Sequence, residues 1–81
     1  MAANKEIGII NNEVAILDSI TEGYPVELTR NDGYRVVLSY ERRRGDEFYI
    51  YQFGKHLKKE FKSWESLLNH LLKYTFTAIK F

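Results

Sequence analysis

The chain has 81 residues, 44% of them hydrophobic and 15% aromatic, with no cysteine and a formal net charge of +1. This apolar content excludes a disordered chain, and the lack of cysteine excludes disulfides and thiolate chemistry. The length predicts a single small domain over residues 1–81.

The sequence contains no candidate for a membrane span or a secretory leader. Its unbroken apolar runs, such as Val14–Leu17, reach four residues, whereas a membrane-spanning helix needs about 20. No basic-then-apolar segment opens the chain. We therefore expect a cytoplasmic protein that does not associate with a membrane.

The N-terminal part of the chain allows two interpretations. Ile7–Ile10 is a short apolar segment that predicts an edge strand. Asn12 can then cap a helix that ends before Gly23, with Val14, Leu17 and Ile20 on one face. Alternatively, Asn11-Asn12 is a hairpin turn and Val14–Leu17 is a strand. The acidic first turn and the glycine favour the helix, whereas the apolar run favours the strand. Both a helix and a strand therefore stay possible for residues 13–22.

The centre of the chain predicts an antiparallel meander, because extended segments alternate with turn residues. Its turns are Asn31-Asp32-Gly33, an exposed loop from Arg42 to Asp46, and Gly54-Lys55. The predicted strands are Val26–Arg30, Tyr34–Glu41, Glu47–Phe53 and Leu57–Phe61.

The C-terminal part predicts an amphipathic helix over residues 63–73, capped by Ser63. His70 is expected on its polar side, and Thr75–Phe81 has the composition of a further strand. The apolar stripe comprises Trp64, Leu67, Leu68, Leu71 and Leu72. The predicted fold class is α+β: an antiparallel meander of four to five strands, with this helix packed on one face and a short N-terminal helix as an option.

Period-two alternation divides the strand residues between two faces. We place Val36, Leu38 and Tyr40 under the helix with Phe48 and Ile50, which leaves the neighbouring tyrosines on the far face. That face, with the arginine loop at its rim, is the predicted binding surface. Its residues are Arg35, Arg42, Arg43, Arg44, Tyr49, Tyr51, Phe53, His56 and Lys58.

Two functions follow from that predicted surface. Aromatic rings flanked by cations are typical of single-stranded nucleic-acid binding, which suggests an accessory or regulatory protein. Aromatic and arginine side chains also dominate protein interfaces, which suggests an interaction module. Such a module would act as an inhibitor or adaptor of a host enzyme or transcription complex, and its small size would suit a phage protein. It would act as a monomer or homodimer. If the N-terminal segment instead covers the rings, they form a second buried layer.

The sequence offers no catalytic, cofactor or metal motif. His56 and His70 are the only imidazoles, and no histidine or carboxylate lies three or four residues from His70 to form a metal-ligand pair. Asp46 and Glu47 are adjacent and therefore point to opposite sides of a strand. We expect a non-enzymatic protein that needs no cofactor.

Overall fold

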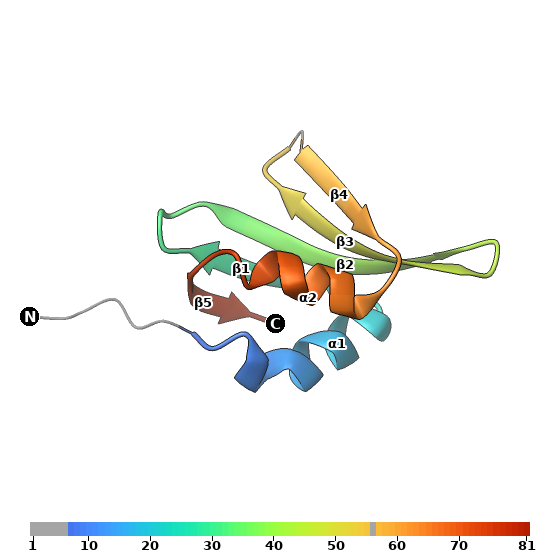
Figure 1. The fold of residues 1–81 in the computed structure, drawn as a ribbon, viewed down its shortest axis with the longest axis horizontal. Helices are drawn as coiled ribbons and strands as arrows, with labels where there is room; N and C mark the ends of the chain where they lie inside the picture. Colours follow the sequence, from blue (N-terminus) through green and yellow to red (C-terminus); the bar gives the residue numbers. More distant parts are fainter. Residues whose placement is uncertain (1–6, 56) are drawn as a thin grey trace, which may run out of the picture.

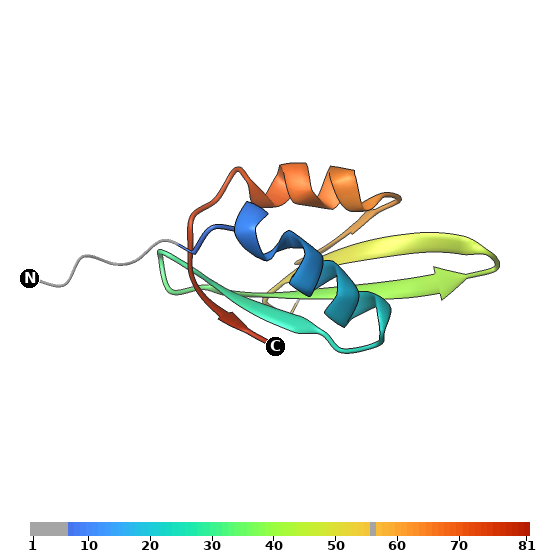
Figure 2. The same ribbon diagram turned by 90° about the horizontal axis from the view of Figure 1, so that it is seen from below.

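The computed structural model describes residues 7–55 and 57–81, which form a five-stranded antiparallel sheet with two α-helices on one face (Figures 1 and 2). This confirms the predicted α+β class. The strand order is β4-β3-β2-β1-β5. Along the chain, the elements are a 3₁₀ turn (Ile10–Asn12), α1 (Glu13–Thr21), β1 (Val26–Arg30), β2 (Arg35–Arg43), β3 (Asp46–Phe53), β4 (Leu57–Phe61), α2 (Trp64–Leu71) and β5 (Phe76–Lys80).

The β1–β2 connection is the tight turn that the sequence predicts. The Gly33 N–H donates to the Arg30 carbonyl at 2.9 Å, and Gly33 has a φ of +89°. An Asp32 carboxylate oxygen also accepts from the Tyr34 N–H at 3.2 Å. The aspartate thus holds the turn while glycine supplies the backbone conformation that other residues disfavour.

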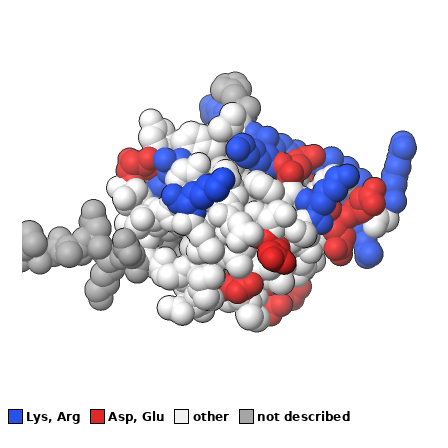
Figure 3. Space-filling model, viewed as in Figure 1, with Lys and Arg blue, Asp and Glu red and all other residues white. Residues whose placement is uncertain are grey.

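The β2–β3 connection is much shorter than predicted. The strands continue to Arg43 and Asp46, which pair with each other, so the turn consists of Arg44 and Gly45 alone. Their φ values of 51° and 85° are both positive, as in the turn type that matches the twist of a β-hairpin. The predicted loop over residues 42–46 is therefore wrong. The hairpin instead projects beyond the helices (Figure 1), with acidic and basic side chains interspersed over its end (Figure 3).

The helical interpretation of the N-terminal part is correct, but the predicted Ile7–Ile10 strand is wrong. A backbone bond of 2.8 Å joins the Ile7 N–H to the Phe76 carbonyl, and the 3₁₀ turn then begins at Ile10. The Asn12 side chain donates to the Gly8 carbonyl at 2.8 Å instead of capping α1, which stabilises this turn rather than an extended segment. Of the predicted helix face, Ile20 is buried and Leu17 packs against the core, but Val14 is 71% exposed and Ile16 is buried instead.

The C-terminal helix begins as predicted, because the Ser63 hydroxyl accepts from the Ser66 N–H at 3.1 Å. Leu67 and Leu71 are fully buried, but Leu72 follows the last helical residue and is 51% exposed. His70 is only 7% exposed, so its predicted place on the polar side is wrong. It is buried because α2 presents it to the ring of Phe61, with ring centroids 5.3 Å apart.

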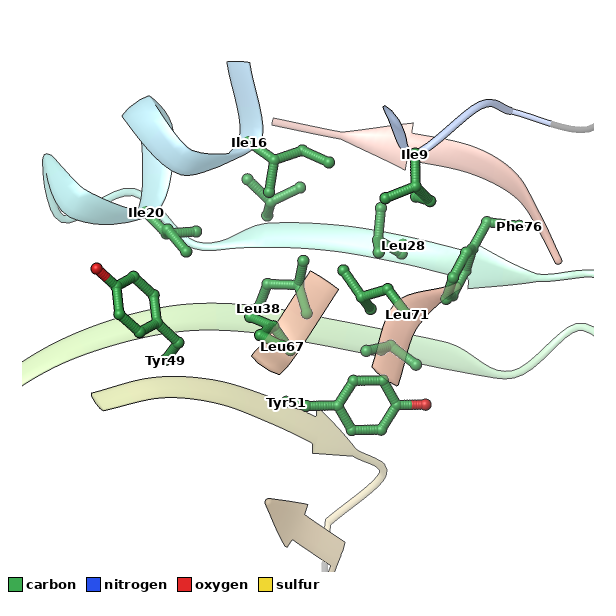
Figure 4. Close-up of a cluster of buried hydrophobic side chains, with 12 residues drawn as sticks. Ile9, Ile16, Ile20, Leu28, Leu38, Tyr49, Tyr51, Leu67, Leu71 and Phe76 are labelled. Carbon is green, nitrogen blue, oxygen red and sulfur yellow. The ribbon is translucent and has the colours of Figure 1, made fainter. Parts of the chain in front are cut away.

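The core fills the space between the helices and the sheet (Figure 4). Helix α1 packs on β1 and β2, whereas α2 packs on β3 and β4. The indole N–H of Trp64 donates to the Glu13 carboxylate at 2.9 Å and joins the two helices directly. Both helices therefore cover the same face, and burial there is the main source of stability.

Strand β5 returns to β1, with Leu28 opposite Ile79 and an irregularity in register between Thr29 and Arg30. This pairing confirms the predicted C-terminal strand. It also makes β5 one edge of the sheet and β4 the other.

Candidate functional site

The predicted aromatic face lies on the opposite side of the sheet from the one we expected. Tyr40 pairs with Tyr49, and Leu38 pairs with Tyr51. Directly paired residues of an antiparallel sheet point to the same face, so Tyr49 and Tyr51 lie under the helices. The alternation within each strand is as predicted. The predicted register between β2 and β3 is wrong, because the register depends on the length of the turn between the two strands.

The two tyrosines belong to the core. Tyr49 is 9% exposed and Tyr51 is 3% exposed, and both rings lie in the same cluster as Leu38, Leu67 and Leu71 (Figure 4). Burial raises the pKa of both phenols. The ring of Tyr51 meets His70 edge-on, with centroids 4.5 Å apart. Neither tyrosine can stack on a base in this fold.

Phe53 is also on the helix side, where it is half-buried between Val36 of β2 and Leu57 of β4. The Arg30 guanidinium lies 4.9 Å from its ring centroid and 4.5 Å from that of Tyr74. The same guanidinium donates to Asp32 at 2.7 Å. Tyr34 covers Phe53 further, at a centroid distance of 5.1 Å. This arrangement is an internal cation–π cluster, which leaves little of Phe53 for a ligand.

The other face of the sheet is not covered by either helix, and we call it the open face. Ile50 is only 2% exposed there although it lies outside the helix-side cluster. Its direct neighbours across the strands are Ser39 and Glu60, so side chains of the open face itself cover it. The open face comprises Glu27, Thr29, Arg35, Val37, Ser39, Glu41, Arg43, Asp46, Phe48, Ile50, Gln52, Lys58, Glu60, Ala78 and Lys80.

Arg43 organises the charges of the open face. It contacts the Glu41 carboxylate through Nε at 2.8 Å and the Glu60 carboxylate through Nη2 at 2.5 Å. Its guanidinium also lies 4.7 Å from the centroid of the Phe48 ring. The hydrogen bond from Arg43 lowers the pKa of Glu60, and Lys58 Nζ lies 3.6 Å from the same carboxylate. Acids and bases in this network largely neutralise each other.

The arginine-rich tip of the hairpin is equally balanced. Residues 41–47 contain three arginines and three acidic residues, which gives a net charge of zero. Arg42 and Arg44 are exposed, and Glu47 lies opposite Arg42 in the strand register. The Tyr40 hydroxyl donates to that glutamate at 2.9 Å, which raises the pKa of Tyr40. The predicted arginine cluster is therefore not a strongly positive surface.

A shallow hollow of about 220 Å³ lies at the β1–β5 end of the open face. Its lining combines apolar residues with one acidic and one basic side chain. The lining residues are Pro25, Glu27, Val37, Lys80 and Phe81. Arg35 stands nearby with its side chain 73% exposed and 3.8 Å from Glu27.

The predicted site residues are thus divided between three places. Arg35, Arg43 and Lys58 lie on the open face, whereas Tyr49, Tyr51 and Phe53 lie under the helices. Arg42 and Arg44 lie at the hairpin end, and His56 falls outside the described residues. The open-face residues that the sequence analysis did not single out are Val37, Phe48, Ile50 and Glu60. Gly45 was the available signal, because an X-Gly pair between strands favours a two-residue turn.

Two features of the described residues bear on possible chemistry: metal-ligand groups and the buried histidine. No group of three or more histidine, cysteine, aspartate or glutamate residues there could hold a metal ion. His70 is buried, and burial is the main cause of its lowered pKa. Across residues 7–55 and 57–81, no helix is long and apolar enough to cross a membrane.

Comparison with known proteins gives no relationship: no family model, curated protein or solved structure matches the chain. The fold defines the class, a small α+β domain with one helix-covered face and one uncovered face.

Proposed function

We propose that this protein is a non-enzymatic protein-binding module that contacts its partner through the open face. The observation that carries the proposal is the mixture of side chains there. Val37 and Phe48 are half-buried apolar side chains of this face, Ile50 is buried among its neighbours, and the Arg43–Glu60 pair lies beside Phe48. An apolar surface that carries aromatic and arginine anchor residues is typical of protein interfaces.

The charge pattern favours a protein partner over nucleic acid. Phosphate binding needs cations that are free to replace counterions, but Arg43 is held by two carboxylates. The tyrosines that would have stacked on bases are buried on the other side. Neither Arg43 nor the buried tyrosines therefore support a single-stranded nucleic-acid ligand, and the interaction module is the better-supported function.

The hollow beside Val37 gives the proposed interface a place for an anchor. Its volume of about 220 Å³ is enough for one apolar or aromatic side chain of a partner. Glu27 and Lys80 at its border supply one charge of each sign for orientation. A homodimer is one form of this contact, because two copies of the same balanced face can be complementary.

A photo-crosslinking amino acid at position 37 tests the proposal in cells that express the protein. The matched control carries the same group at position 14, since Val14 is a valine that is 71% exposed and lies on α1, away from the open face. We expect position 37 to give a discrete adduct that position 14 does not give, and that survives nuclease treatment. An adduct of twice the protein's mass identifies the partner as a second copy.

Three results would count against the open face as the partner-binding surface. They are no adduct at position 37, the same adducts at positions 37 and 14, and adducts that nuclease removes. The variant Val37→Arg provides an independent check, because it should abolish the contact of the unlabelled protein while Val14→Arg leaves it intact. Circular dichroism of both variants establishes that they fold.

A further inference from the structure

Strand β4 forms an edge of the sheet that no other described segment pairs with. Its register with β3 runs from Tyr49 opposite Phe61 to Phe53 opposite Leu57. No backbone hydrogen bond joins its outer side to any described residue. Figure 1 shows β4 at the border of the fold with no element beyond it. Such an edge presents alternate N–H and carbonyl groups that can pair with an added strand.

The opposite edge differs in this respect. On β5, the Phe76 carbonyl already accepts from the Ile7 N–H at 2.8 Å. The chain entering the 3₁₀ turn thus occupies part of that edge. Of the two edges, β4 is the one whose outer side is free along its whole described length.

The β4 edge also lies within a basic stretch of the chain. Residues 55–62 contain four lysines and one glutamate, a net charge of +3. That glutamate, Glu60, is already bonded by Arg43 at 2.5 Å. Lys59 has no ion pair within the described residues, and Lys58 has only the 3.6 Å approach to Glu60. Figure 3 shows basic side chains along the upper border, where β4 lies.

We propose that β4 binds an extended acidic peptide segment of a partner protein by adding it to the sheet as a sixth strand. Main-chain hydrogen bonds would give the affinity, and side chains on alternate faces would give the specificity. Lys58 points to the open face and Lys59 to the helix side. A partner strand with two consecutive acidic residues therefore places one carboxylate beside each lysine.

The flanking positions specify the rest of the recognised pattern. Leu57 is 55% exposed and Phe61 is half-buried, both on the helix side with Lys59. An antiparallel partner would then read apolar, polar, acidic, acidic, apolar, with its apolar residues opposite Phe61 and Leu57. This contact is separate from the open face and goes beyond the proposed function, although it rests on the same conclusion that the partner is a protein.

Nucleic acid is a weaker match to this edge. Phosphates would satisfy the lysines, but they would leave the strand's backbone donors and acceptors unpaired. Lysines on an edge strand also discourage self-association. Peptide binding therefore has to be distinguished from nucleic-acid binding and from a role of the lysines in preventing self-association.

The test is an NMR titration of the whole protein with an end-blocked peptide of sequence TVTEEVT. We expect the largest amide shifts in residues 57–61 and smaller ones in β5. The double variant K58E/K59E should bind about tenfold more weakly, since two attractive contacts become repulsive. K80E, on the opposite edge, is the matched control and should bind like the wild type. K58Q/K59Q gives an intermediate loss and guards against misfolding of the reversed variant.

Several outcomes would overturn the proposal. They are equal binding of the peptide TVTKKVT, equal binding of a short oligothymidylate, unchanged affinity of K58E/K59E, or shifts that avoid β4. Self-association of K58Q/K59Q without any peptide binding by the wild type would show that the lysines serve only to prevent edge pairing. Val37→Arg should leave peptide binding unchanged, so a failure here is distinguishable from a failure of the open-face contact.

Discussion

The Tyr51 hydroxyl provides the sharpest test of the packing under α2. The side chain is 3% exposed, and its oxygen has no hydrogen-bond partner among the described residues. The Arg30 guanidinium is near enough to oppose the rise in the pKa of Tyr51 that burial causes. Its closest hydrogen bond goes to Asp32, however, at 2.7 Å. The phenol oxygen is therefore buried with no well-formed hydrogen bond to a described residue and only the nearby Arg30 charge to compensate.

Replacing Tyr51 with phenylalanine should stabilise the protein. A buried polar group without a partner costs about 1–3 kcal/mol, and the small void left by the missing oxygen offsets part of the gain. We expect a net increase of about 1 kcal/mol in the free energy of unfolding, or about 4–8 °C in Tm for a domain of this size. Edge-on packing with His70 is retained, because the ring is unchanged.

Urea and thermal unfolding of the purified variants measure this effect. Tyr24 is 67% exposed, so Tyr24→Phe is the matched control and should change stability by less than about 0.5 kcal/mol. A loss of stability in Tyr51→Phe would refute the reasoning. It would mean that the hydroxyl makes a hydrogen bond, with the Arg30 guanidinium as the donor.

Two further predictions concern the hairpin turn and the buried histidine. Arg44 has a φ of 51°, which asparagine tolerates better. Arg44→Asn should therefore raise the free energy of unfolding by about 0.5–1 kcal/mol, whereas Arg42→Asn, within β2, should not; equal effects would contradict the two-residue turn. Burial first, then Lys59 and Lys73, lowers the pKa of His70. The unfolded chain consequently binds a proton more readily, so wild-type stability should fall as the pH drops below about 6.5, by at most about 1.4 kcal/mol per pH unit. A His70→Leu variant, followed by urea unfolding across the same pH range, should lack this component; identical pH profiles would contradict it.

The local elements could be predicted because their signals are local. Ser63 caps a helix with its own hydroxyl, and Asn31-Asp32-Gly33 encodes a turn within three residues. The binding surface could not be predicted in the same way. Moving the turn from a five-residue loop to Arg44 and Gly45 shifts β3 against β2 so that the other set of residues faces the helices.

The buried position of His70 shows the same limit in the helix. Its place in the sequence suggests the polar side of α2, but burial depends on which distant rings approach it. Phe61, Tyr51 and Tyr74 all lie within 5.5 Å of its ring centroid. These contacts follow from the packing of α2 over β3 and β4, which no local pattern specifies.

The pairing of β1 with β5 has a consequence for the conformational entropy of the chain. Glu27 lies opposite Lys80, 53 positions later. Bringing such distant residues together costs about 2–3 kcal/mol more than closing a two-residue turn. Burying one phenylalanine recovers about 1.5–3 kcal/mol, and Phe76 on β5 is 1% exposed. A single aromatic side chain thus compensates for most of the entropy lost when the first and last strands meet.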